Sequence, residues 1–323
     1  MCACYHPLKI FYTGRKTEKG GREGVITSGF LERLSLKTAA RKLPGLKLTD
    51  CKWMEQDVNG NYFLTKSDQI PCGKCIGCKL SKSQDWATRV MLEAKEYGDR
   101  NAFLTLTYDD GHLPKDGKVT KREMQLFIKK LRKAYGNGLR ICYCGEYGSI
   151  TKRPHYHMLI LNINIQNQKR WNKVLTTSQD IDKIWGKGNV LIGKVTFQSA
   201  AYVARYQVKS VGFDDGSFFV TPRRPGLGYD YYAKNGQIFG NGKIYMAGNK
   251  GNQFSIPKYF KRKLREEDEI TALYLSEKMK PGMDAKARQL VKAYEGKGSL
   301  EKVLEYQEEE QKRKARKLHR PIN

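Results

Sequence analysis

The chain has 323 residues, with 60 lysines and arginines against 33 aspartates and glutamates, and its formal net charge is +27. This length allows two domains, or one domain with sizeable additions. The positive charge is spread along the chain, so we expect a polyanionic partner, and nucleic acid is favoured because lysine and arginine neutralise phosphates. An anionic membrane is disfavoured, because no run of about eighteen apolar residues occurs.

Glycine and proline interrupt residues 1–70, which predicts an irregular or short-stranded lead-in. A helix is expected from about Ser81 to Tyr97. Strands are then expected at 103–108, 139–146, 155–161 and 190–197, and helices at 180–185, at 200–211 and from Thr120, where Glu123 completes a capping-box pattern. The strand at 155–161 is apolar on both faces, which predicts a central position in the sheet.

Strand, helix, strand, strand, helix, strand is the order of the split βαβ, ferredoxin-like arrangement, so the predicted fold class is α+β with a central antiparallel sheet. We expect four parts: an N-terminal region 1–98, a catalytic core 99–212, a Gly/aromatic-rich extension 213–260 and a charged helical region 261–323. In the last part Glu308–Glu310 precede Lys312–Lys317, an order that suits helical ion pairs. We interpret it as a solvated face without chemistry.

His155 and His157 lie two residues apart on a predicted strand, so both imidazoles point to one face. Two neutral imidazoles suit a divalent cation, and an antiparallel return places Glu146, at the end of the preceding strand, beside His155. One carboxylate with two imidazoles leaves open positions, as a catalytic metal requires, and phosphate chemistry favours Mg²⁺ or Mn²⁺. The alternative interpretation is a surface glutamate near two hydrogen-bonded histidines.

The helix expected at 200–211 has two distinct faces. Its apolar face consists of Ala201, Ala204, Val208 and Val211. Tyr202, Tyr206 and Lys209 lie about 150° away on a helical projection, and the two hydroxyls are about 6 Å apart along the axis. Two tyrosines beside a lysine, away from the apolar face, predict a nucleophilic site.

A tyrosine hydroxyl is a poor nucleophile near neutral pH because its pKa is about 10. Lys209, one turn after Tyr206, can stabilise a phenolate, so we expect Tyr206 to attack first. Attack on a phosphodiester leaves a 5′-phosphotyrosine and a free 3′ hydroxyl. Resealing then needs no ATP, and a second tyrosine, Tyr202, allows the two to alternate in repeated unit-length cutting.

Cys72, Cys75 and Cys78 in PCGKCIGC form two overlapping CxxC turns, a spacing at which thiolates share a tetrahedral Zn²⁺. Cys4 or Cys2 can supply a fourth ligand if the N-terminus folds back, and His6 is a weaker candidate. Three free thiols and an iron–sulfur cluster are the alternatives. Eight cysteines are too few for a disulfide scaffold, and the N-terminus lacks a secretory pattern, so we expect a cytoplasmic protein.

At these residues the sequence resembles the replication initiators of microviruses, small single-stranded DNA phages, and most closely the gokushovirus type. These initiators belong to the HUH endonucleases, whose motif is matched by PHYHMLIL at His155 and His157. YVARYQVK matches the two-tyrosine motif at Tyr202 and Tyr206, and Glu146 matches the carboxylate ligand of related viral initiators. FLTLTY at 103–108 and TPRRPGLG at 221–228 extend the resemblance, which covers most of residues 70–260.

The resemblance implies a metal-dependent nickase and ligase that acts on single-stranded DNA at a viral origin during rolling-circle replication, in the cytoplasm of a bacterial host. It also favours a structural zinc held by Cys4 and the cysteine triplet, because gokushovirus-type proteins share both. No GxxxxGK[ST] motif occurs, so a separate helicase, supplied by the host, is expected. The alternatives are an HUH transposase or relaxase and a non-catalytic nucleic-acid-binding module.

Overall fold

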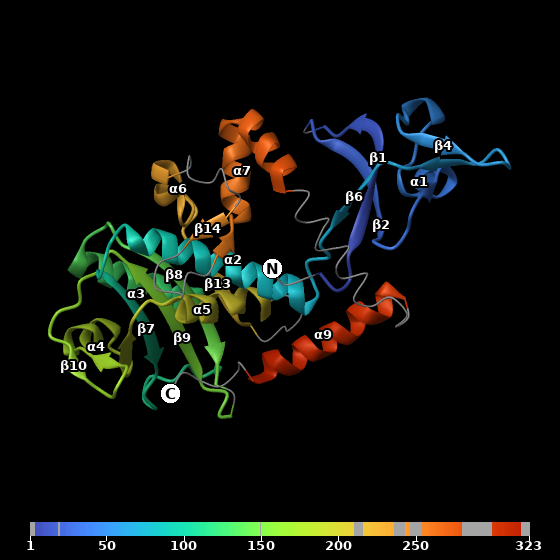
Figure 1. The fold of residues 1–323 in the computed structure, drawn as a ribbon. Coiled ribbons are helices and arrows are strands. Elements are labelled where there is room, and N and C mark those ends of the chain that lie inside the picture. Colours follow the sequence, from blue (N-terminus) through green and yellow to red (C-terminus); the bar gives the residue numbers. More distant parts are fainter. Residues whose placement is uncertain are drawn as a thin grey trace. The chain divides into compact units, whose positions relative to one another are not determined.

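The computed structural model describes residues 4–18, 20–148, 150–209, 216–235, 243–245, 253–279 and 299–317, without the side chains of 206–209, 243–245, 253–254 and 316–317. The chain forms two compact units (Figure 1). The first consists of Met1–Lys79 and Lys286–Asn323, and the second of Leu80–Ala285. Among the described helices, none is long and apolar enough to span a membrane.

The first unit contains two three-stranded antiparallel sheets. One has the order β2 (Arg22–Ser28), β1 (Leu8–Lys16) and β6 (Ser67–Ile70), and the other has the order β3 (Leu34–Ser35), β5 (Tyr62–Leu64) and β4 (Met54–Gln56). Two short helices, α1 (Leu36–Lys42) and η1 (Leu48–Asp50), and the C-terminal α9 (Leu300–Lys317) complete the unit. Phe11, Val25 and Leu64 lie in a shared core, so the short-stranded lead-in forms a packed structure of its own.

The second unit is built on a seven-stranded antiparallel sheet with the order β10-β11-β12-β7-β9-β8-β13. These strands are β7 (Asn101–Thr107), β8 (Arg140–Tyr147), β9 (Pro154–Leu161), β10 (Lys169–Arg170), β11 (Thr176–Thr177), β12 (Val190–Gly193) and β13 (Phe218–Val220). Along the chain, α3 (Lys121–Tyr135) joins β7 to β8, and α4 (Gln179–Trp185) follows β9 and precedes β12. The strand expected at 155–161 is central, as predicted, because β9 pairs with both β7 and β8.

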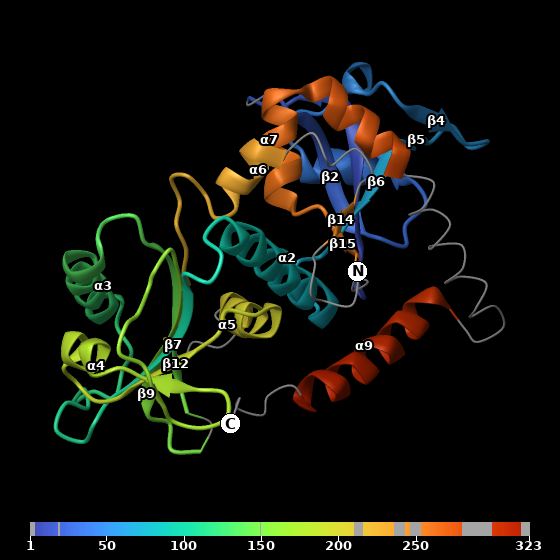
Figure 2. The same ribbon diagram turned by 60° about the vertical axis from the view of Figure 1, so that its left-hand side comes forward.

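Helices cover both faces of this sheet (Figure 2). α3 and α4 lie on one face, and α2 (Ile76–Lys95) and α5 (Phe197–Lys209) lie on the other. The alternation of β9 explains the two cores, because Tyr156, Met158 and Ile160 pack with α3 and α4, whereas Leu159 and Leu161 pack with α2 and α5. A mixed α+β class with antiparallel sheets is therefore confirmed.

Three helix starts show where local patterns succeed and where they fail. Thr120 caps α3 as predicted, because its hydroxyl oxygen accepts the Glu123 N–H at 3.3 Å. The strand expected to reach Phe197 ends at Gly193 instead, because Thr196 and Ser199 cap each other's backbone N–H groups and α5 begins at Phe197. α2 begins at Ile76 and not near Ser81, because its first N–H donates to the distant Glu308 carboxylate at 3.1 Å.

The remainder of the second unit follows β13. It contains α6 (Tyr229–Asn235), the hairpin of β14 (Lys243–Tyr245) and β15 (Gln253–Ser255), α7 (Lys258–Glu267) and a helical stretch at 269–279. Tyr232 and Phe260 pack against Leu92 of α2 in a third core. The boundaries expected at 98, 212 and 260 stay predictions.

Candidate metal centre and tyrosine site

Glu146, His155 and His157 converge on the face of the sheet that α5 covers. The register of β8 and β9 pairs Glu146 directly with His155 and pairs Cys144 with His157. His155 Nε2 and His157 Nε2 lie 2.9 and 2.6 Å from the same carboxylate oxygen, Glu146 Oε1. The ligand atoms of all three residues lie within 4.8 Å of one another, an arrangement that can hold a metal ion.

Hydrogen bonds on the far side of each ring orient the two histidines. His155 Nδ1 lies 3.1 Å from the carbonyl oxygen of Arg153, which can only accept, so Nδ1 carries a proton. A neutral His155 then directs its Nε2 lone pair at a carboxylate, which is favourable when a cation lies between them. His157 Nδ1 is held by the Thr105 hydroxyl at 3.0 Å. This donor set fits a divalent cation with oriented imidazole ligands.

The charges in the cluster suit the same interpretation. Glu146 and His157 are only 4% and 7% exposed. Burial alone would raise the pKa of Glu146, but hydrogen bonds from His155 and His157 outweigh it and lower that pKa to about 2. Burial lowers the pKa of His157, although Glu146 opposes this effect. A charged carboxylate beside a neutral imidazole is a metal-binding combination.

Tyr202 is half-buried, and its hydroxyl reaches this cluster from α5. Its Oη donates to Glu146 Oε1 at 2.8 Å and lies 3.5 Å from His157 Nε2. Its ring packs edge-on against His157, with ring centroids 5.0 Å apart. Burial raises the pKa of Tyr202, and the negative charge of Glu146 raises it further. Without a cation, the hydroxyl is therefore protonated and bound to the carboxylate.

The other predicted residues of α5 are described only in part. The backbone of Tyr206 and Lys209 lies in α5, but their side chains lie outside the described residues, as does Val208. Val211 falls outside the described backbone as well. The buried face of α5 consists of Ala200, Val203 and Ala204, whereas Ala201, which was expected there, is only half-buried. The projection was therefore displaced by one residue, because the helix buries Val203 under α2 and β9.

Three residues that the sequence did not single out complete the surroundings. Phe103 stacks on the His157 ring with centroids 5.5 Å apart, and Thr105 orients the same ring. Arg205 lies 5.3 Å from the centroid of the Tyr202 ring, and its charge counteracts the rise in the pKa of Tyr202. A signal existed: Phe103 and Thr105 share one face of a strand predicted beside the histidines, and Arg205 is three residues after Tyr202.

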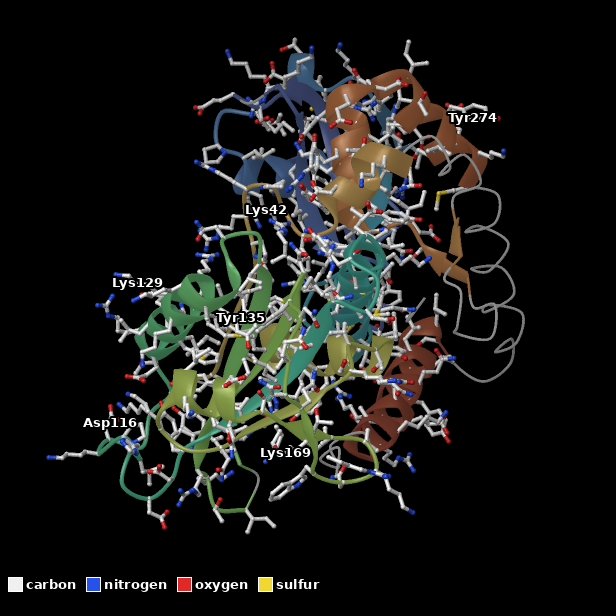
Figure 3. The ribbon with its side chains drawn as sticks, turned by 90° about the vertical axis from the view of Figure 1, so that its left-hand side faces the viewer. Lys42, Asp116, Lys129, Tyr135, Lys169 and Tyr274 are labelled. Carbon is white, nitrogen blue, oxygen red and sulfur yellow. The ribbon has the colours of Figure 1, made fainter. Side chains whose placement is uncertain are left out.

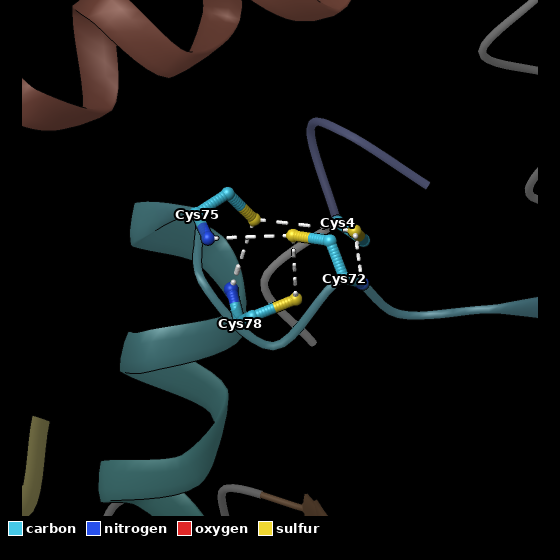
Figure 4. A group of neighbouring side chains, drawn as sticks. All are labelled: Cys4, Cys72, Cys75 and Cys78. Atoms are coloured by element: carbon cyan, nitrogen blue, oxygen red, sulfur yellow. Dashed lines mark hydrogen bonds between the residues drawn. The ribbon is translucent and has the colours of Figure 1, made fainter. Parts of the chain in front are cut away.

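A second cluster joins Cys4 to the cysteine triplet in the first unit (Figure 4). The four Sγ atoms lie within 4.8 Å of one another, and Cys72–Cys78 and Cys75–Cys4 are 3.9 and 4.0 Å apart. Four sulfurs about 2.3 Å from one Zn²⁺ would be separated by about 3.8 Å. Cys2 lies outside the described residues, and His6 is instead bound to Glu308 at 2.7 Å. Cys142 and Cys144 are buried in the second unit, as expected.

Backbone N–H groups point at the sulfurs of this cluster. Cys75 donates to Cys72 Sγ at 3.3 Å, Cys78 to Cys75 Sγ at 3.4 Å and Cys72 to Cys4 Sγ at 3.2 Å. Burial opposes ionisation, yet the N–H groups of Cys75 and Lys74 lower the pKa of Cys72 to about 7. The backbone therefore favours thiolate, the form of cysteine that binds metal.

α9 packs against the cysteine cluster through Leu300 and Leu304. Glu308 of the same helix is only 6% exposed, accepts the Ile76 N–H at 3.1 Å and pairs with His6. The interpretation of this region as a solvated face is therefore wrong at Glu308, although most charged residues of α9 are exposed.

Comparison with known proteins places this geometry in a family. Residues 101–211 match the model of a family of replication-associated proteins that is named after ORF2. The chain is 34% identical over 246 residues to Replication-associated protein ORF2 of Spiroplasma virus 4, covering 69% of this chain and 76% of the relative. It is 35% identical over 211 residues to Replication-associated protein VP4 of Bdellovibrio phage phiMH2K, covering 59% and 66% of the two chains.

A third relative, Replication-associated protein ORF4 of Chlamydia phage 1, is 30% identical over 237 residues, which cover 66% of this chain and 58% of the relative. No solved structure matches the chain. The matched family segment contains Glu146, His155, His157 and Tyr202, the residues that converge in the structure. The chain therefore belongs to the ORF2 family of phage replication-associated proteins, which confirms its resemblance to the microvirus replication initiators.

Proposed function

We propose that this protein is the endonuclease and ligase that initiates rolling-circle replication, by tyrosine attack on single-stranded DNA at a viral origin in a bacterial host. The observation that carries the proposal is the contact of the Tyr202 hydroxyl with Glu146 Oε1, the oxygen that both imidazoles face. A candidate nucleophile and a candidate metal site thus meet at one atom. Membership of the replication-associated family supports the same function.

The topology of the second unit supports a ferredoxin-like HUH core. Its inner strands run β12-β7-β9-β8 across the sheet and are connected β7-α3-β8-β9-α4-β12. This is the split βαβ connectivity, in which the two strands nearest the centre are the first and third in the chain. The candidate ligands then lie on a central strand and its neighbour, and the tyrosine helix lies directly across them.

Glu146, His155 and His157 would hold Mg²⁺ or Mn²⁺, which would polarise a non-bridging oxygen of the scissile phosphate. The Tyr202 oxygen forms a bond to phosphorus while the bond from phosphorus to the 3′ oxygen breaks. The proton lost by the phenol balances the proton gained by the 3′ oxygen. The reverse attack by a 3′ hydroxyl reseals the strand. That Tyr206 cuts first and that Lys209 assists it stay predictions.

The decisive experiment incubates the protein with single-stranded origin DNA and Mn²⁺ and separates the products on a denaturing gel. A covalent protein–DNA adduct is expected, and it should disappear in Tyr202→Phe/Tyr206→Phe. Tyr274→Phe is a matched control, because Tyr274 is 58% exposed and lies far along the chain from α5. Binding of DNA without metal and without an adduct would instead support the non-catalytic module.

We also propose that Cys4, Cys72, Cys75 and Cys78 hold a structural Zn²⁺. The near-tetrahedral spacing of the sulfurs and the N–H groups directed at them support this assignment. Zinc bound by four cysteines leaves no open position for a substrate, so its role would be to stabilise the first unit.

A further inference from the structure

A basic groove of about 970 Å³ lies between α3 and the edge of the sheet in the second unit. Its walls carry six exposed cations: Lys129, Lys130, Arg132, Lys133, Arg223 and Arg224. No aspartate or glutamate lines it, and in the described part of the chain no salt bridge joins any of the six to a carboxylate. Lys129 extends outward from α3 in Figure 3. The groove is a concave surface with unneutralised positive charge.

The segment TPRRPGLG at 221–228 forms one wall of the groove and is fixed in place by buried charges. Glu93, which has no exposed surface in its side chain, pairs with Arg140 at 2.5 Å and accepts the Gly228 N–H. Arg140 also donates to the Pro225 carbonyl at 3.1 Å. Removing one member of such a pair leaves an unpaired buried charge, so the segment has a strong structural anchor. That anchor presents Arg223 and Arg224 to the groove.

Helix stabilisation does not explain this charge. Cations in the last turn of a helix interact favourably with its dipole, which accounts for Arg132 and Lys133 of α3. It does not account for Lys129 and Lys130 farther from the end, or for two arginines on a separate segment that converge on the same groove. Unpaired cations repel one another, so their convergence indicates an anionic partner.

The groove and the candidate active site use opposite ends and opposite faces of β8. Leu139, Ile141 and Tyr143 line the groove on the α3 face, whereas Glu146 faces α5. From Arg140 to Glu146 the strand advances about 20 Å, which corresponds to about six phosphates of one DNA strand. The groove can therefore be occupied while DNA is at the tyrosine site.

We propose that this groove binds the phosphate backbone of duplex DNA that flanks the nicking site, an inference that rests on the proposed function. Proteins that bind single strands stack bases on exposed aromatic side chains. Tyr143, the aromatic residue that lines the groove, is only 5% exposed, so the groove offers cations but no stacking surface. Phosphate contacts of this kind position a protein on DNA without reading its sequence.

The test measures binding of the full chain to a duplex of about 30 base pairs in EDTA, where no nicking occurs, at a series of salt concentrations. Arg223→Gln/Arg224→Gln should lower the slope of log affinity against log salt by about 1.8, because each lost phosphate contact removes about 0.9. The loss should be equal for unrelated sequences. Lys121→Gln/Arg122→Gln removes two exposed α3 cations outside the groove and should leave the slope unchanged.

Three results would overturn the proposal: an unchanged slope in the groove variant, an equal loss in the control, or a larger loss with a single strand than with the duplex. Thermal unfolding of both variants should match that of wild type, since all four side chains are exposed. The failures are distinguishable. A protein that forms no tyrosine adduct still reports on the groove, and a protein that nicks DNA but shows no groove effect refutes only this inference.

Discussion

The proton of Tyr202 is held on Glu146 Oε1, beside the atoms that would bind the cation. Burial and the negative carboxylate both raise the pKa of this phenol, so the protein must lower it again before tyrosine can attack. Arg205 is the described side chain whose positive charge does so. Lys209 was expected in this role from the sequence, and its contribution stays a prediction.

Arg205→Gln should therefore make the Tyr202 phenolate rarer at neutral pH. We expect adduct formation to fall about tenfold at pH 7, and its pH–rate profile to move about one unit higher, because a raised pKa needs a higher pH to yield the same phenolate fraction. Arg205→Lys should restore most of the rate. An equal loss at every pH, without displacement of the profile, would contradict this role.

Thr105 is expected to act through His157, whose Nδ1 it holds at 3.0 Å. Thr105→Val should weaken Mn²⁺ binding about 10- to 100-fold, as measured by calorimetric titration, because the ring loses the partner that fixes its orientation. Thr107→Val is the matched control, since the Thr107 hydroxyl bonds to the Asn189 carbonyl instead. Similar losses in both variants would indicate damage to β7 and not an effect on His157.

At the scale of elements, the sequence predicted the central strands and the helices between them. Alternation and capping are local signals, and they sufficed for β7, α3, β8 and β9 and for the pairing of Glu146 with His155. They failed where a distant residue decides: Ile76 begins α2 because Glu308, 232 residues later, accepts its N–H. Arg205 was missed because a cation on an amphipathic helix usually faces solvent.

Glu308→Gln tests this distant cap. The variant loses the charge that pairs with His6 and weakens the bond to Ile76, so amide exchange at the start of α2 should become about tenfold faster, or about 1.4 kcal/mol. Glu309→Gln removes an exposed carboxylate that pairs only with Lys312, and its effect should stay within about 0.5 kcal/mol. Equal exchange in the two variants would show that Glu308 does not cap α2. The measurement is hydrogen–deuterium exchange with mass spectrometry.

At the scale of the whole molecule, the two candidate metal sites belong to different units and share no donor. Cys75→Ser should remove bound zinc, measured by elemental analysis, while Mn²⁺ affinity at the Glu146 cluster is retained. Glu146→Gln should do the reverse, because a carboxylate is a ligand in one site and absent from the other. Loss of both metals from either variant would show that the sites depend on each other.

The first unit combines the two ends of the sequence, Met1–Lys79 and Lys286–Asn323, whereas the second is continuous. The ribosome therefore delivers every residue of the second unit before it reaches Glu308. Chains fold as they emerge, one domain after another. The cysteines must consequently wait through most of translation for α9, so the first unit is the last to be completed, although its residues are the first to be made. A nonsense mutation before codon 308 would leave the nuclease sheet encoded in full and deprive α2 of its cap.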